Sequence, residues 1–108
     1  MKYPVVIWRF LKVSGLTLYP FIILSRPELK SDRVIVRHEL IHIRQAEELL
    51  IIPFYLLYLL NYLINLLIYH NHNKAYMNIV FEREAYHCEN DKEYLERRKF
   101  WAWVRFFR

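Results

Sequence analysis

The residues best suited to chemistry are the five from His38 to His42, His-Glu-Leu-Ile-His, which form an H-E-x-x-H pentapeptide. Side chains four residues apart lie on one face of a helix, so both imidazoles can point at one spot and coordinate a single zinc ion. Glu39 is then placed to take a proton from a water on that metal. The pattern indicates a metallohydrolase. The alternative is that these residues decorate a solvated helix face.

A catalytic zinc ion usually has three protein ligands, so another His or Glu is expected further along the chain. The segment from Phe81 to Tyr86, Phe-Glu-Arg-Glu-Ala-Tyr, supplies two candidates, Glu82 and Glu84. The alternative for both glutamates is an ordinary charged helix with Arg83 between them.

Together, H-E-L-I-H and E-R-E-A-Y resemble the glutamate-type zincins, in particular the CAAX prenyl protease family and the β-lactam sensor peptidases. In these families H-E-x-x-H is followed on a later helix by E-x-x-A-D. The resemblance implies that Glu82 is the third zinc ligand, that Ala85 is the small residue, and that Tyr86 stands where the families have an aspartate that orients a zinc-bound histidine. A phenol can accept that hydrogen bond but carries no charge, so zinc affinity or ligand basicity is expected to be lower. A register that starts at Glu84 would lose the alanine and put Cys88 at the orienting position.

The resemblance to these families covers only the two motifs. The chain also resembles, throughout its length, a group of short uncharacterised bacterial proteins.

Composition favours one small helical domain. A chain of 108 residues has a limited core, which a metal or a membrane would help to stabilise. Apolar residues make up 56% and there is a single glycine, so helices are expected rather than disorder. Cys88 is the only cysteine, which excludes an intrachain disulfide and favours a reducing compartment.

The charge pattern favours a membrane surface over nucleic acid. The net charge is +5, and the basic residues are interleaved with Trp and Phe, as is typical of segments that lie at headgroup depth. No nucleic-acid-binding motif is recognised. We therefore expect a cytoplasmic protein at the inner face of the membrane, without a nucleic-acid partner.

The N-terminal region, 1–25, predicts a β-hairpin. Two runs rich in β-branched and aromatic residues, 3–13 and 16–24, flank Ser14-Gly15, and Pro20 would mark an edge or a bulge. A signal peptide is rejected because charged residues interrupt the apolar stretch. The resemblance to zincins implies that the edge of this β element can align an extended peptide.

Region 32–70 predicts the H-E-x-x-H helix, capped by Ser31 or Asp32, followed by a long apolar helix. Residues 49–69 carry no charge and are long enough to cross a bilayer. A single crossing, however, would put the two histidines and Glu82 on opposite sides of the membrane, so it excludes the three-ligand site. Pro53 is expected to kink the helix near its start.

The apolar segment is also amphipathic. Its tyrosines and asparagines recur at helical spacing on one face, and leucine and isoleucine fill the other. The aliphatic face could pack on the hairpin with the tyrosines elsewhere, or the helix could lie in a membrane interface. The tyrosine face either packs against other helices or forms a substrate or lipid groove.

Region 78–108 predicts the helix of Glu82, capped by Asn78, and a last helix that opens at Asn90-Asp91-Lys92-Glu93. That helix ends in a basic aromatic tail, 97–108, which would anchor to a membrane, dock on a partner or cover the core. It could also lie over the metal and keep the enzyme latent.

These observations predict a mainly α protein with a short N-terminal β-hairpin (α+β), a reduced zincin-like helical domain. Its expected function is that of a membrane-associated zinc metallopeptidase-like hydrolase that acts on peptides or proteins, with a homodimer allowed. Tyr86, His87 and His70 are candidates for an orienting or oxyanion-stabilising role. The alternative is a non-catalytic membrane-associated helical protein with an inert or structural metal site.

Overall fold

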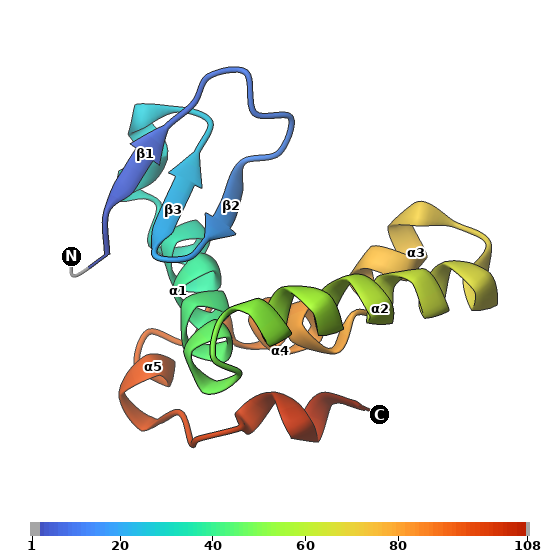
Figure 1. The fold of residues 1–108 in the computed structure, drawn as a ribbon. Coiled ribbons are helices and arrows are strands. Elements are labelled where there is room, and N and C mark those ends of the chain that lie inside the picture. The colour runs from blue at the N-terminus through green and yellow to red at the C-terminus, as the bar shows by residue number, and fades with distance from the viewer. Residues whose placement is uncertain (1–2, 108) are drawn as a thin grey trace.

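The computed structural model describes residues 3–107, which form a small sheet followed by helices, as the mainly α prediction requires (Figure 1). The sheet packs beside the first long helix, and the second long helix projects away from both (Figure 1). The elements in chain order are β1 (Val5–Ile7), β2 (Gly15–Leu18), β3 (Phe21–Leu24), η1 (Pro27–Ser31), α1 (Arg33–Glu48), α2 (Ile52–Tyr69), α3 (His72–Met77), α4 (Val80–Cys88), α5 (Tyr94–Arg97) and η2 (Ala102–Phe107).

The sheet has three strands in the order β1-β3-β2, with β1 parallel and β2 antiparallel to β3. The hairpin turn lies at Tyr19-Pro20, between β2 and β3, and the prediction of a turn at Ser14-Gly15 was wrong. Proline has no N–H for a sheet ladder, so a turn suits it better than the interior of a strand. Ile22 and Leu24 of β3 face the core, where they meet Ile43 of α1.

The motif helix α1 begins where the sequence predicts. The Asp32 carboxylate accepts hydrogen bonds from the Val34 and Ile35 amides and so caps the helix. The helix ends at Glu48, and a tight turn with positive φ at Leu50 and Ile51 leads into α2. Pro53 stands in the first turn of α2, where its missing N–H has no partner to lose. It therefore starts a new helix instead of kinking a continuous one.

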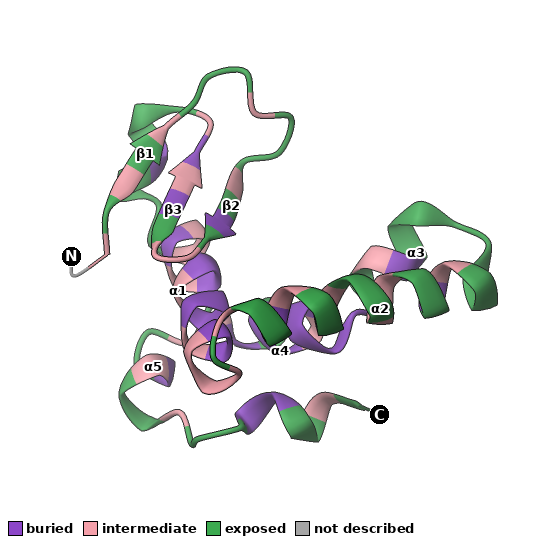
Figure 2. Ribbon diagram, in the orientation of Figure 1, coloured by how far each residue is buried: buried purple, intermediate pink, exposed green. Residues whose placement is uncertain are grey.

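Most of the long helix α2 is exposed (Figure 2), and its exposed residues are mainly leucine and isoleucine, whereas Tyr55, Tyr58 and Tyr62 are partly buried. Tyr55, Tyr58 and Tyr62 pack around the buried Phe54 and Phe81. The first packing alternative, with the aliphatic face on the hairpin, was thus wrong. Within residues 3–107, α2 is the one helix that is long and apolar enough to cross a membrane, and only 11% of it is buried.

The return from α2 to α4 differs in its capping from the prediction. Asn78 ends α3, where its side-chain amide donates to the Lys74 carbonyl. The first amide of α4, that of Val80, instead donates to the side-chain oxygen of Asn61 on α2. A side chain distant in sequence has taken the capping role.

The C-terminal region contains two short helices, α5 and η2, in place of one long helix. Trp103 is buried against Phe81 in the main core cluster, so the tail covers the core in part. Other tail side chains, Phe100, Trp101, Val104 and Phe107, remain exposed.

Candidate metal centre

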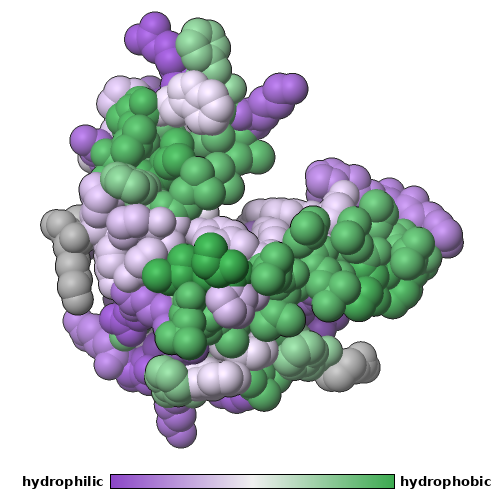
Figure 3. Space-filling view, viewed as in Figure 1, coloured by the Kyte–Doolittle hydropathy of each residue, from purple (hydrophilic) through white to green (hydrophobic). Residues whose placement is uncertain are grey.

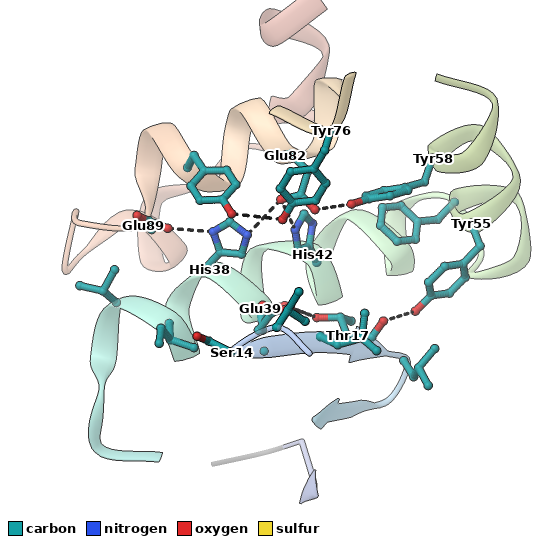
Figure 4. Close-up of a pocket in the computed structure, with 18 of the residues that line it drawn as sticks. Ser14, Thr17, His38, Glu39, His42, Tyr55, Tyr58, Tyr76, Glu82 and Glu89 are labelled. Atoms are coloured by element: carbon teal, nitrogen blue, oxygen red, sulfur yellow. Dashed lines mark hydrogen bonds and ion pairs between the residues drawn. The ribbon is translucent and has the colours of Figure 1, made fainter. Parts of the chain in front are cut away.

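His38 and His42 on α1 face Glu82 on α4, as the motifs predict. The Oε1 atom of Glu82 lies 3.1 Å from Nε2 of His38 and 3.1 Å from Nε2 of His42 (Figure 4). The ligand atoms of the three residues all lie within 4.8 Å of one another. The three residues are buried, with 6%, 5% and 4% of their surfaces exposed for His38, His42 and Glu82. The two histidines lie close together because they are one turn apart on α1. Glu82 reaches them because α4 packs against α1.

The other ring nitrogen of each histidine has an acceptor. His38 Nδ1 lies 2.8 Å from Oε1 of Glu89, and His42 Nδ1 lies 2.8 Å from Oε1 of Gln45. A carboxylate can only accept, so His38 donates its Nδ1 proton to Glu89. Each Nε2 atom faces Glu82, where it either donates a proton to that carboxylate or, once this proton is lost, presents a lone pair to a metal ion. This is the usual arrangement around metal-binding histidines.

The amide of Gln45 is oriented by its own partners. Its Nε2 donates to the Phe81 carbonyl at 3.0 Å and to Oε1 of Glu84 at 2.9 Å. Both partners are acceptors, so the amide oxygen must be the atom that faces His42. His42 Nδ1 therefore carries a proton.

Tyr58 of α2 holds the second oxygen of Glu82. Its hydroxyl donates a short hydrogen bond to Oε2, which leaves Oε1 for the two histidines. Burial and the neighbouring Glu82 raise the pKa of Tyr58, so the phenol keeps its proton and remains a donor.

The charges of the centre are strongly coupled. Burial acts to lower the pKa of His42, but the adjacent Glu82 carboxylate outweighs it and raises that pKa to about 9. Burial acts to raise the pKa of Glu82, but His42 and His38 hold it well below its usual range. The centre therefore attracts positive charge.

Glu39 points from α1 toward β2 (Figure 4). Its Oε1 accepts a hydrogen bond from the Thr17 hydroxyl at 2.7 Å. A Cβ atom at Gly15 would lie 3.1 Å from Oε2 of Glu39, so the single glycine of the chain leaves room for this carboxylate. Strand β2 thus fixes the candidate base.

The centre lies in a cleft of about 770 Å³ between β2 and α2, and His38, Glu39, His42 and Glu82 all line it. Among residues 3–107, none after Glu89 lines this cleft. The tail instead packs along α4. The hypothesis that the tail covers the metal was therefore wrong.

The three candidates for supporting roles are placed differently. Tyr86 lines the cleft, but its ring packs edge-on against His38, 4.4 Å between centroids, and its hydroxyl lies 3.1 Å from that of Tyr76. It does not replace the orienting aspartate, because Glu89 binds His38. His87 is exposed beside Phe106, and the exposed His70 ends α2, so neither reaches the centre.

Glu84, the rival ligand, contacts neither histidine and is instead bound by Arg98, Tyr94 and Gln45. Its carboxylate binds Arg98 at 2.6 Å, and it also accepts from Tyr94 and Gln45. Arg98 in turn binds Glu48 at 2.6 Å. Hydrogen bonds from Arg98, Gln45 and Tyr94 keep the pKa of Glu84 low, although burial acts to raise it. The Glu84 carboxylate therefore pairs with Arg98, and Glu82 is the residue that faces the histidines.

Four residues of the centre escaped the sequence analysis: Gln45, Tyr58, Tyr76 and Glu89. Gln45 follows His42 by three positions and Glu89 follows Glu82 by seven, both on the same helix face, so their spacing carries a signal. Tyr58 and Tyr76 carry no local signal of proximity. Comparison of the chain with models of protein families, with curated proteins and with solved structures finds no match.

Proposed function

We propose that this chain is a zinc-dependent hydrolase of the metallopeptidase type, with His38, His42 and Glu82 as ligands and Glu39 as general base. The observation that carries the proposal is the convergence of three possible ligand atoms on one buried point. With both Nδ1 protons donated elsewhere, loss of the Nε2 protons would leave two lone pairs and the Glu82 carboxylate facing one another. Such a set is stable only with positive charge between its members.

The donor set fits zinc. Ligand atoms of a tetrahedral zinc ion, with bonds of about 2.1 Å, lie roughly 3.4 Å apart. Each Nε2 atom lies 3.1 Å from Oε1 of Glu82, close to that separation. Two imidazoles with one carboxylate are a known catalytic zinc set. All three line the cleft, which gives solvent and substrate a way in.

Bound zinc supplies a water of lowered pKa and polarises a carbonyl group. Glu39, held by Thr17, takes the proton of the attacking water and passes it to the leaving amine. The Tyr76 and Tyr86 phenols line the same cleft and are candidate donors for a developing oxyanion. Burial raises the pKa values of both phenols, so they remain protonated at neutral pH.

The zincin resemblance implies that a peptide substrate pairs with the edge strand β2. Only part of this edge is open to such pairing. The Tyr55 hydroxyl donates to the Thr17 carbonyl and accepts from the Tyr19 amide, so these two edge groups are taken. An extended peptide would therefore pair with the beginning of β2, near Gly15.

The second candidate is a structural metal site without catalysis. The observation that favours it is the cross-link itself: the ligands join α1 to α4, and Tyr58 ties α2 to the same carboxylate. In this case metal removal would unfold the protein, and no substrate would be cleaved.

Elemental analysis of the purified protein tests the proposal. One zinc per chain is expected, with loss in His42→Ala and Glu82→Gln and retention in Glu93→Gln, an exposed glutamate outside the centre. A folded wild-type protein that takes up no zinc on reconstitution would contradict the proposal.

A second experiment separates catalysis from structure. Glu39→Gln is expected to keep its zinc and lose hydrolysis of a peptide library that the wild type cleaves. Zinc that stabilises the fold, in a wild-type protein that cleaves no peptide of the library, would favour the structural site.

A further inference from the structure

The aliphatic face of α2 is uncovered along the whole helix. We define it as the outward row Ile52, Leu56, Leu57, Leu59, Leu60, Leu63, Ile64, Leu67 and Ile68, all exposed. Figure 3 shows the hydrophobic side chains of α2 gathered in one continuous patch toward the viewer. A monomeric soluble protein rarely leaves so large an apolar surface in water.

The open face of the sheet continues this surface. Val6, Leu16, Leu18 and Phe21 are exposed on it, and a second hydrophobic patch lies over the sheet in the same view (Figure 3). The loop from β1 to β2 adds the exposed Trp8, Phe10 and Val13. The sheet face and the aliphatic face of α2 therefore look the same way, with the cleft between β2 and α2.

The elements that form this surface contain basic residues but no acidic ones. All eleven acidic residues fall within 28–48 and 82–96, so the sheet, its loop and α2 contain none. Arg9 and Lys12 lie in the loop, and Lys74 lies on α3, which packs against α2. The hydrophilic residues around α5 lie on the opposite side of the view, at the lower left (Figure 3).

Hydrogen bonds on the inward side of α2 hold the helix against the rest of the protein. Tyr55 is bonded to Thr17 and Tyr19 near the start of the helix, Tyr58 to Glu82, and Asn65 to the Ala75 carbonyl near the end. The protein thus occupies one side of α2 over a length of about 27 Å. If α2 crossed a bilayer alone, these hydrogen bonds would be broken.

We propose that the aliphatic face of α2 and the open sheet face dock on a lipid bilayer with anionic headgroups, with α2 in the plane of the interface. An apolar row between basic residues is the pattern of helices that lie on such membranes. A second copy of the chain would bring the same positive border against this one, so like charges would oppose self-association. This surface is independent of the proposed hydrolase activity.

Vesicle flotation with the full chain tests the proposal. The protein is expected to float with vesicles of phosphatidylcholine and phosphatidylglycerol, and to bind less to phosphatidylcholine alone. The variant carrying Leu60→Glu and Leu67→Glu, at positions that are 53% and 76% exposed, should lose binding by about 100-fold or more.

The control variant carries Lys30→Gln and Lys92→Gln, exposed lysines on η1 and in the loop before α5. Its net charge falls by two units, as it does in the variant with two glutamates, and it should bind as the wild type does. Equal losses in both variants would overturn the proposal, because binding would then follow net charge alone. Equal binding to both vesicle types would overturn the anionic preference.

Three other outcomes also overturn the proposal. One is a folded wild-type protein that does not bind vesicles. Another is a lipid-free dimer that Leu60→Glu with Leu67→Glu dissociates, without vesicle binding, which would assign the face to a second copy. The last is resistance to carbonate extraction, which would assign α2 to a transmembrane span. Unchanged circular dichroism in both variants establishes that they fold.

Discussion

The Nδ1 atom of His42 lies 2.8 Å from Oε1 of Gln45, whose amide is turned by two acceptors on α4. The tautomer of a candidate metal ligand is thus set by a residue one turn away and by the helix packed across from it. The same contact links the centre to Glu84 and, through it, to Arg98. The candidate site and the C-terminal segment therefore belong to one buried polar network.

Replacement of Gln45 by Met tests this link. The variant keeps the length of the side chain but removes the acceptor for His42, so zinc affinity should fall by about 10–100-fold. In the metal-free protein above about pH 9, where His42 is neutral, imidazole ¹⁵N shifts should report the proton on Nδ1 in the wild type and a mixture of tautomers in the variant. Unchanged affinity with unchanged shifts would contradict a positioning role for Gln45.

Replacement of Arg98 by Met should destabilise the fold. The variant leaves Glu48 and Glu84 buried without their cation, and the free energy of unfolding should fall by about 3–5 kcal/mol. Arg97→Met is the matched control, because the Arg97 side chain is 63% exposed and pairs at the surface with Asp91. Its effect should stay below about 1 kcal/mol. Urea denaturation measures the free energy of unfolding of both variants. Equal losses in the two variants would contradict a stabilising role for the buried Arg98 pairs.

Tyr58→Phe should weaken metal binding without unfolding the protein. Loss of the hydroxyl frees Oε2 of Glu82 and lets the carboxylate rotate away from the histidines, so affinity should fall roughly tenfold. Tyr62→Phe, one turn further along α2, removes a hydroxyl that bonds the exposed His72 and should leave affinity unchanged. Competition with a zinc chelator measures both, and the prediction fails if the two variants behave alike.

The metal-free protein should lose stability in alkali. The pKa of His42 is raised to about 9 from an unfolded value near 6.5, so its contribution is complete below about pH 6.5 and disappears as the pH rises through about 9. Thermal unfolding should therefore show a smaller gap between wild type and His42→Asn at high pH than at neutral pH. A gap that does not change with pH would contradict the charged pair with Glu82.

Local features of the fold followed from the sequence. Asp32 caps α1, and His38 and His42 share a face, because helix geometry fixes neighbours three and four positions apart. The two-faced character of α2 was equally visible, since its tyrosines recur at helical spacing. The choice of which face points inward was not.

Contacts between distant segments were decided by the tertiary structure. The parallel pairing of β1 with β3 and the cap that Asn61 gives to α4 depend on chain crossings that no local pattern encodes. In the site, the sequence indicated His38, Glu39 and His42, and the family resemblance indicated Glu82. Gln45 lies within a helix turn of His42, but Glu89 and Tyr58 became partners only when α4 and α2 packed against α1, because a hydrogen bond needs its two groups within about 3 Å and packing sets that distance.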